Sequence, residues 1–90
     1  MANTNSNMGW HSIDGTFEQH VDWGYEIEFI YKEKEYHIEK KPNGSILVIT
    51  WEGEIKPVKS FSSLEEFMNG KLFNRTVKWL IKNVRFTGIH

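Results

Sequence analysis

The sequence predicts an α+β fold, a small antiparallel sheet of three to four strands with helices packed on one face. Two observations support this prediction. Apolar and polar residues alternate over 25–31 and 36–39, and a β-branched run follows at 46–51, as half-buried and more deeply buried strands require. Near both ends of the chain, at 16–23 and 77–84, apolar residues recur at the spacing of a helix. The expected order is α-β-β-β-(β)-α-α.

The composition is that of one globular domain. The chain has 90 residues, of which 39% are hydrophobic and 26% are charged, so it can build a single core but hardly a large enclosed cleft. We expect residues 1–8 to form a disordered tail and residues 9–90 to form a single α+β domain. Cysteine is absent, which excludes disulfides, zinc ribbons and thiol chemistry.

The sequence carries no targeting signal or membrane span that we recognise. The start "MANTNSNMGW" has neither a basic nor an apolar region of a signal peptide. The longest apolar run, "ILVITW", is far shorter than the roughly 20 residues that cross a bilayer. We therefore expect a cytoplasmic protein that does not bind membranes.

The first half of the chain predicts a helix followed by a hairpin. The helix runs from about Thr16 to Trp23, and Gly24 is placed to end it. From residue 25 the period changes to two, so that "YEIEFIY" and, after "KEKE", the "YHI" segment predict two paired strands. The apolar members of both strands should share one buried face.

The second half predicts two further strands and two helices. "ILVITW" predicts a third strand, and "EIKPVKSF" can add a fourth, which Pro57 restricts to an edge. A helix should start at Ser62 or Ser63 and end at Asn69-Gly70. The last helix should begin with Asn74 as its cap and run to about Val84, and "RFTGIH" should trail away without regular structure.

The segment "FEQHVDWGYEIEFIYKEKEYHIEK" resembles a loose set of small, mostly uncharacterised proteins from Gram-positive bacteria and their phages. In those proteins a helix ends at Gly and an "EIEF-x-Y-x-G-K-x-Y-x-I" hairpin follows. The later segments "SFSSLEEFMNGKLF" and "TVKWLIKNV" look similar to their C-terminal helical part, so the resemblance covers about residues 16–84. It implies a fold and a bacterial or phage origin, and it implies no activity.

The chain departs from that pattern at the hairpin turn. Glu33 stands where the pattern has Gly. Glutamate tolerates a positive φ poorly, so we expect a loop longer than two residues at this place.

No residue pattern in the chain points to catalysis, a metal or a cofactor. His11, Asp14, His20 and Asp22 lie close in sequence but lack the spacing of a metal site. His37 is expected to be a solvated side chain on the polar face of its strand. No serine lies in a nucleophile elbow and no glycines form a phosphate loop. We therefore expect a protein that is not an enzyme and binds no cofactor.

Charges are sorted along the chain although the net charge is −1. Residues 1–31 contain five Asp or Glu and no Lys or Arg, whereas residues 67–90 contain five Lys or Arg and no Asp or Glu. Such sorting indicates either a basic binding surface or two terminal segments that face each other in the fold.

Trp79 lies on the wrong side of the last predicted helix for a core residue. If Val77, Leu80 and Val84 point inward, Trp79 points outward at about 100° per residue. We call the outward set the stripe; it consists of Arg75, Lys78, Trp79 and Lys82.

Three accounts of the stripe follow. In the first, Trp79 packs beneath Trp10 or Phe17, and the basic residues pair with acidic residues 14, 18 and 22. In the second, Trp79 is exposed and forms a protein-binding hot spot. In the third, the stripe binds single-stranded nucleic acid, against which the isoelectric point near 6.4 counts.

The function expected from the sequence is that of a small, non-enzymatic protein-binding module, encoded by a bacterium or a phage. Its partner, which the sequence does not identify, would contact the stripe or an exposed sheet edge. A homodimer formed through a sheet edge is the nearest rival. The alternative of another class is a nucleic-acid-binding accessory protein that uses the basic C-terminal helix.

Overall fold

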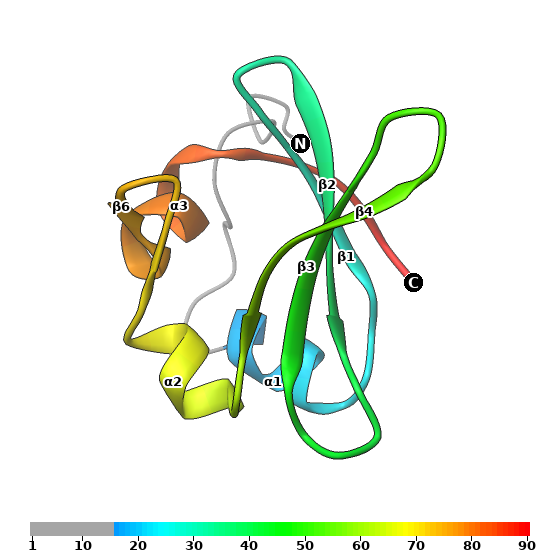
Figure 1. Ribbon diagram of the computed structural model, residues 1–90. Coiled ribbons are helices and arrows are strands. Elements are labelled where there is room, and N and C mark those ends of the chain that lie inside the picture. The colour runs from blue at the N-terminus through cyan, green and yellow to red at the C-terminus, as the bar shows by residue number, and fades with distance from the viewer. Residues whose placement is uncertain (1–15) are drawn as a thin grey trace.

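The computed structural model describes residues 16–90, so the predicted tail at 1–8 lies outside the described part. A five-stranded antiparallel sheet has the order β4-β3-β2-β1-β7, and three helices cover one of its faces (Figure 1). This confirms the predicted fold class. The sheet strands are β1 (Ile27–Tyr31), β2 (Lys34–Lys40), β3 (Ile46–Trp51), β4 (Ile55–Phe61) and β7 (Arg85–Ile89).

Helix α1 (Thr16–Asp22) ends at the predicted glycine. Gly24 has a φ of 93°, a backbone conformation that side chains with a Cβ rarely adopt. The Tyr25 N–H donates to the His20 carbonyl at 3.0 Å, and the Gly24 N–H donates to the Val21 carbonyl at 3.0 Å. These two bonds form a Schellman cap, which satisfies the last carbonyls of the helix and turns the chain into β1.

The loop between β1 and β2 is a two-residue turn, so the prediction of a longer loop was wrong. Tyr31 pairs directly with Lys34, and only Lys32 and Glu33 lie between the strands. Their φ values of 50° and 68° are both positive. A two-residue turn with both residues in this region matches the twist of the paired strands. The strand pairing therefore imposes a conformation that Glu33 by itself disfavours.

Helix α2 (Leu64–Met68) starts at a serine and ends at Asn69, as predicted. The Ser63 hydroxyl accepts a hydrogen bond from the Glu66 N–H at 3.1 Å and caps the first turn. The Glu66 carboxylate in turn accepts the Ser62 N–H at 2.5 Å and the Ser62 hydroxyl at 3.0 Å. These donors stabilise the charged form and hold the pKa of Glu66 below its ordinary value.

The start of the last helix differs from the prediction. Helix α3 (Val77–Asn83) is capped by Thr76, whose hydroxyl accepts the Trp79 N–H at 3.1 Å. A small hairpin precedes it, formed by β5 (Lys71–Leu72) and β6 (Arg75–Thr76). Asn74 is not the cap, because it lies with Phe73 in the hairpin turn, where their φ values are 65° and 59°.

The segment expected to trail away is strand β7. It pairs antiparallel with β1, so that Phe86 lies opposite Phe29 and Ile89 lies opposite Ile27. As an edge strand it buries little, and its residues alternate between exposed and half-buried. This weak pattern did not separate it from coil in the sequence.

The core lies between the sheet and the three helices. Strands contribute Ile27, Phe29 and Val48, and the helices contribute Val21 and Phe67, each at most 2% exposed. Fourteen buried apolar residues form one continuous cluster. Burial of this area drives folding and fixes which side of α3 faces outward.

Candidate functional site

The centre of the candidate site is a cation stacked on an aromatic ring. The Arg75 guanidinium lies 4.3 Å from the centre of the Trp79 ring. Arg75 comes from β6 and Trp79 from the first turn of α3, so the two side chains belong to two different elements. The sequence analysis had placed both on one helix. The Trp79 side chain remains 38% exposed. A cation over an indole face is favourable even at an exposed site.

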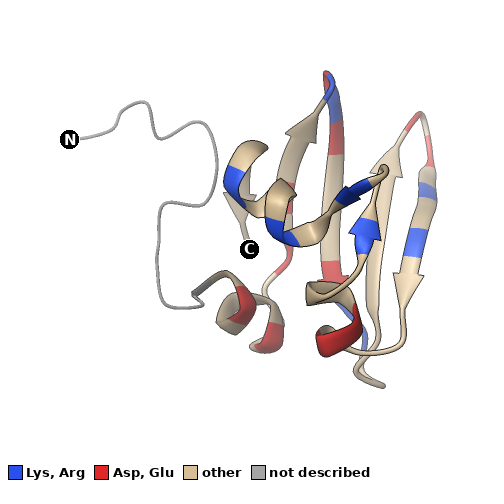
Figure 2. Ribbon diagram, turned by 90° about the vertical axis from the view of Figure 1, so that its left-hand side faces the viewer, with Lys and Arg blue, Asp and Glu red and all other residues tan. Residues whose placement is uncertain are grey.

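The rest of the stripe follows from the amphipathic character of α3. Val77 and Leu80 are buried with exposed fractions of 2% and 4%, so the opposite side of the helix faces solvent. Lys78 and Lys82 lie one turn apart on that side and are exposed. Figure 2 shows the basic segments of α3 together with the neighbouring basic segments of β5 and β6. The acidic segments of this layer belong to α1 and α2.

Within residues 16–90 the basic members of the stripe have no carboxylate partner. No ion pair joins Arg75, Lys78 or Lys82 to any described Asp or Glu. The predicted partner Asp22 instead binds Lys40, with 3.1 Å between the charged atoms. Asp14, the other end of a predicted pair, lies outside the described residues.

The structure also contradicts the predicted contact between Trp79 and Phe17. Phe17 stacks on Phe67 with ring centres 6.4 Å apart and contacts the Phe86 ring at 5.9 Å. Trp79 is partly exposed instead of lying beneath this ring. Trp10, the other predicted cover, lies outside the described residues.

The acidic and basic terminal segments do lie side by side, because β7 pairs with β1. The ion pair that joins them is made by a histidine. His90 Nε2 lies 2.9 Å from the Glu28 carboxylate. In addition, His37 Nδ1, on strand β2, lies 3.1 Å from the Glu26 carboxylate. His37 is therefore half-buried and bound to a carboxylate, where a solvated side chain was expected. The lysines and arginines of the last segment take no part in these contacts.

This group of histidines and glutamates does not form a metal site. Among residues 16–90, no three His, Cys, Asp or Glu side chains are arranged to hold an ion. His20 and Asp22 were considered as ligands in the sequence. His20 instead packs against the Tyr25 ring at 5.2 Å, and Asp22 binds Lys40. The other two candidates, His11 and Asp14, lie outside the described part.

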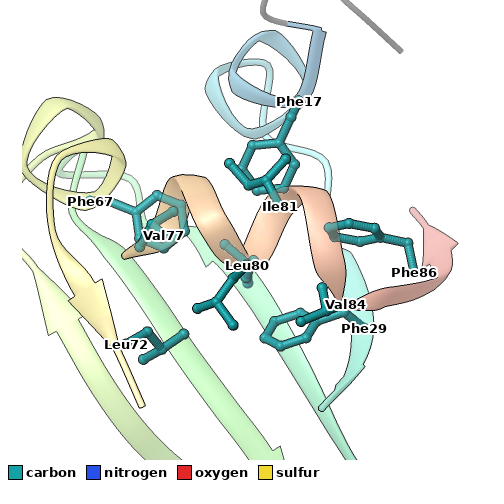
Figure 3. A pocket seen from close by; sticks show the side chains of 10 residues that line it. Phe17, Phe29, Phe67, Leu72, Val77, Leu80, Ile81, Val84 and Phe86 are labelled. Carbon is teal, nitrogen blue, oxygen red and sulfur yellow. The ribbon is translucent and has the colours of Figure 1, made fainter. Parts of the chain in front are cut away.

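A small apolar cavity lies between α1, α3 and the sheet (Figure 3). Its walls include Phe17, Leu80, Ile81 and Phe86, and its volume is about 10 Å³. A space of this size is at the lower limit for one water molecule, and its lining offers hardly any polar surface to bind one. The cavity is a small packing defect in the core and not a ligand pocket.

The sequence analysis missed a second exposed apolar surface on the β3–β4 hairpin. Trp51 and Ile55 pair directly across the two strands, and each side chain is 60% exposed. The sequence contains the signal, since "ILVITW" has apolar residues at positions that face both sides of a strand. Which side the helices cover could be decided only from the structure.

Comparisons with known proteins do not assign the chain to a family. No family model matches the chain, and neither a curated protein nor a solved structure matches it. The resemblance to small Gram-positive and phage proteins therefore stays a prediction. Among the described residues, no helix has the length and apolar character needed to cross a membrane.

Proposed function

We propose that this protein is a non-enzymatic binding module and that the stripe contacts an acidic surface of another protein. The supporting observation is the exposed Arg75–Trp79 stack beside lysines that lack carboxylate partners. Tryptophan and arginine are enriched among the residues that supply most of the energy of protein interfaces. Lys78 and Lys82 would add long-range attraction and orient an acidic partner.

The stack favours a protein partner over nucleic acid. Single-stranded nucleic acids bind by stacking bases on open aromatic faces. Arg75 covers one face of the Trp79 indole, so a base would have only the other face available. The alternative of a nucleic-acid-binding accessory protein rests on the cluster of basic residues. It predicts binding that weakens steeply as salt rises.

The predicted origin suggests where the partner is found. If the chain is encoded by a Gram-positive bacterium or its phage, as the resemblance implies, the partner is a cytoplasmic protein of that host. The β4 edge of the sheet is a poorer contact site, because β4 carries Pro57 and two lysines, features that oppose strand pairing.

Affinity capture from a Gram-positive cell lysate tests the proposal. The wild type, Trp79→Ala and Trp23→Ala are used as bait, with and without nuclease, and the bound proteins are quantified by mass spectrometry. Trp23 is 64% exposed and directly follows α1, far from Trp79 in the sequence, so it is a matched control for loss of an exposed indole.

We expect proteins that bind the wild type and Trp23→Ala, resist nuclease and are lost with Trp79→Ala. Equal capture by Trp79→Ala would refute the stripe as the contact surface. Loss of all capture after nuclease treatment would favour the nucleic-acid alternative.

A further inference from the structure

The sheet has one face covered by helices and one that no described helix covers. Directly paired residues in an antiparallel sheet point to the same face, and successive residues point to opposite faces. In β3, Ile46 and Val48 are fully buried on the helix side. Leu47, Ile49 and Trp51 therefore point to the open face. Their neighbours in β4 on this face include Pro57 and Ile55, which pair with Ile49 and Trp51.

The two halves of this open face differ in polarity. An antiparallel sheet with one solvated face normally carries polar residues there. Strands β1 and β2 follow this rule with Glu28, Glu35, His37 and Glu39, and Ile30 is the exception. Strands β3 and β4 do not follow it. We name their apolar group the β3–β4 patch; it consists of Leu47, Ile49, Trp51, Ile55 and Pro57, of which Ile49 is only 8% exposed.

We propose that the β3–β4 patch is the interface of a homodimer, in which the open sheet faces of two copies pack on each other. The most exposed part of the patch is apolar, since Trp51 and Ile55, at the turn end of the hairpin, are each 60% exposed. Exposed apolar groups of this kind in soluble proteins mark interaction surfaces. Two sheets that pack face to face with nearly aligned strands are a common arrangement in proteins.

The charges around the patch favour a second copy as the occupant. No member of the patch is charged, so two copies can meet without like-charge repulsion. The nearest carboxylate in the hairpin, that of Glu52, is neutralised by ion pairs with Lys34 and Lys56. A strongly charged partner would find no free counter-charge in the centre of this surface.

A two-fold axis along β3 also keeps the acidic halves of the two open faces apart. Such an axis places the β1–β2 half of one copy over and beyond the β4 edge of the other, because the two halves lie on opposite sides of β3. The acidic residues Glu35 and Glu39 of the two copies then lie on opposite sides of the axis, so they do not face each other across the interface.

The dimer would be formed through a sheet face, unlike the edge-paired dimer expected from the sequence. Edge pairing through β4 is opposed by Pro57, which lacks an N–H, and by a register shift at Val48/Ile49 that leaves Val58 unpaired. The stripe lies on the helix layer, on the other side of the sheet. A face-to-face dimer therefore leaves two stripes open, which makes the assembly bivalent.

Sedimentation equilibrium tests this inference with the full chain at protein concentrations from about 1 µM to about 1 mM. We expect the wild type to approach twice the chain mass. Trp51→Glu and Ile55→Lys each place a charge in the apolar centre and should raise the dissociation constant at least about 100-fold. Trp23→Glu changes an equally exposed indole outside the patch and should dimerise like the wild type.

Circular dichroism verifies that each variant is folded, which we expect because Trp51 and Ile55 are mostly exposed. Added salt should change dimerisation little, since the centre of the interface is apolar. A wild type that stays monomeric throughout would overturn the inference, as would Trp51→Glu and Ile55→Lys variants that dimerise normally. A dimer lost only in Lys78→Glu or at high salt would place the interface at the stripe instead.

Discussion

Trp79 belongs to the proposed binding surface and also contributes to the stability of the fold. Its indole is more covered than a freely exposed side chain, since Arg75 stacks on it, but it is not part of the buried cluster. We expect Trp79→Ala to lower the free energy of unfolding by about 1 to 2 kcal/mol, less than the 3 to 5 kcal/mol of a core aromatic residue. Urea unfolding followed by circular dichroism measures this loss.

The matched control for Trp79→Ala is Trp23→Ala, which should cost about 0.5 kcal/mol or less because that side chain is 64% exposed. A loss of more than about 3 kcal/mol for Trp79→Ala would show that the indole supports the core. The binding defect of the variant would then have a structural explanation.

Glu66 links the cap of α2 to the stability of the protein at acid pH. Its pKa is held below the ordinary 4.5 by hydrogen bonds from Ser62. A carboxyl group with a lowered folded-state pKa contributes stability above its unfolded-state pKa and loses it as the pH falls through the folded-state pKa. We expect the stability difference between wild type and Glu66→Gln to be largest near neutral pH and to shrink from about pH 5 downward.

Thermal unfolding of both proteins between pH 7 and pH 3 measures this difference. Glu65→Gln is the control, because Glu65 lies next to Glu66 but makes no hydrogen bond to Ser62. A difference between wild type and Glu66→Gln that stays constant over this pH range would mean that the Glu66 carboxylate does not cap the helix in solution.

The turn between β1 and β2 stores backbone strain. Glu33 has a φ of 68°, and the left-handed region costs a residue with a Cβ on the order of 1 kcal/mol. Glycine adopts this region without that cost but has more freedom to lose on folding. We expect Glu33→Gly to raise the free energy of unfolding by about 0.5 to 1 kcal/mol, with an unchanged dependence on urea.

The contrasting variant is Glu35→Gly, two residues later within β2. Glycine inside a strand adds chain entropy without relieving a positive φ, so this change should lower stability by about 0.5 to 1 kcal/mol. If Glu33→Gly also destabilised the protein, the two-residue turn would not be the conformation in solution.

The elements that could be predicted from the sequence are those whose pattern is local and long enough to read. Helices α1 and α2 were found from Gly24 and the serines before Leu64, and β1 to β4 from their alternation and from Pro57. Strands β5 and β6 have two residues each, which is too short for a period. The predicted start of α3 at Asn74 was wrong for the same reason. Asn74 lies in the turn of the β5–β6 hairpin, and this hairpin could not be recognised in the sequence.

The candidate surfaces also contain parts that could be predicted from the sequence and parts that could not. Three members of the stripe could be predicted, because the buried side of α3 sets the direction of Lys78, Trp79 and Lys82. The stack of Arg75 on Trp79 depends on the β5–β6 hairpin and was not predictable from a helical wheel. The β3–β4 patch required the strand register, since a shift of one residue exchanges the two faces of a strand.

At the scale of the whole molecule, the sheet order predicts where the fold is most resistant to opening. Strand β2 is the central strand, with two strands on either side, whereas β4 and β7 are edges. Amides in the centre of a sheet exchange only in large opening events, but outward amides at an edge exchange with little opening. We expect the slowest hydrogen exchange in β2, including Tyr36 and Ile38, and the fastest strand exchange in β4 and β7.

The same measurement distinguishes a dimer that packs through its sheet faces from one that pairs through a sheet edge. A dimer that packs through its open sheet faces leaves the outward amides of both edges in water, so their exchange should stay the same from about 10 µM to about 1 mM protein. A dimer paired through an edge adds a hydrogen-bonded strand there and slows the amides of β4 or β7 as the concentration rises. Concentration-dependent protection along Lys56–Ser60 or Arg85–Ile89 would therefore favour edge pairing. Protection that depends on concentration at neither edge, together with dimer formation by sedimentation, would exclude edge pairing, and loss of the dimer in Trp51→Glu would then assign the interface to the β3–β4 patch.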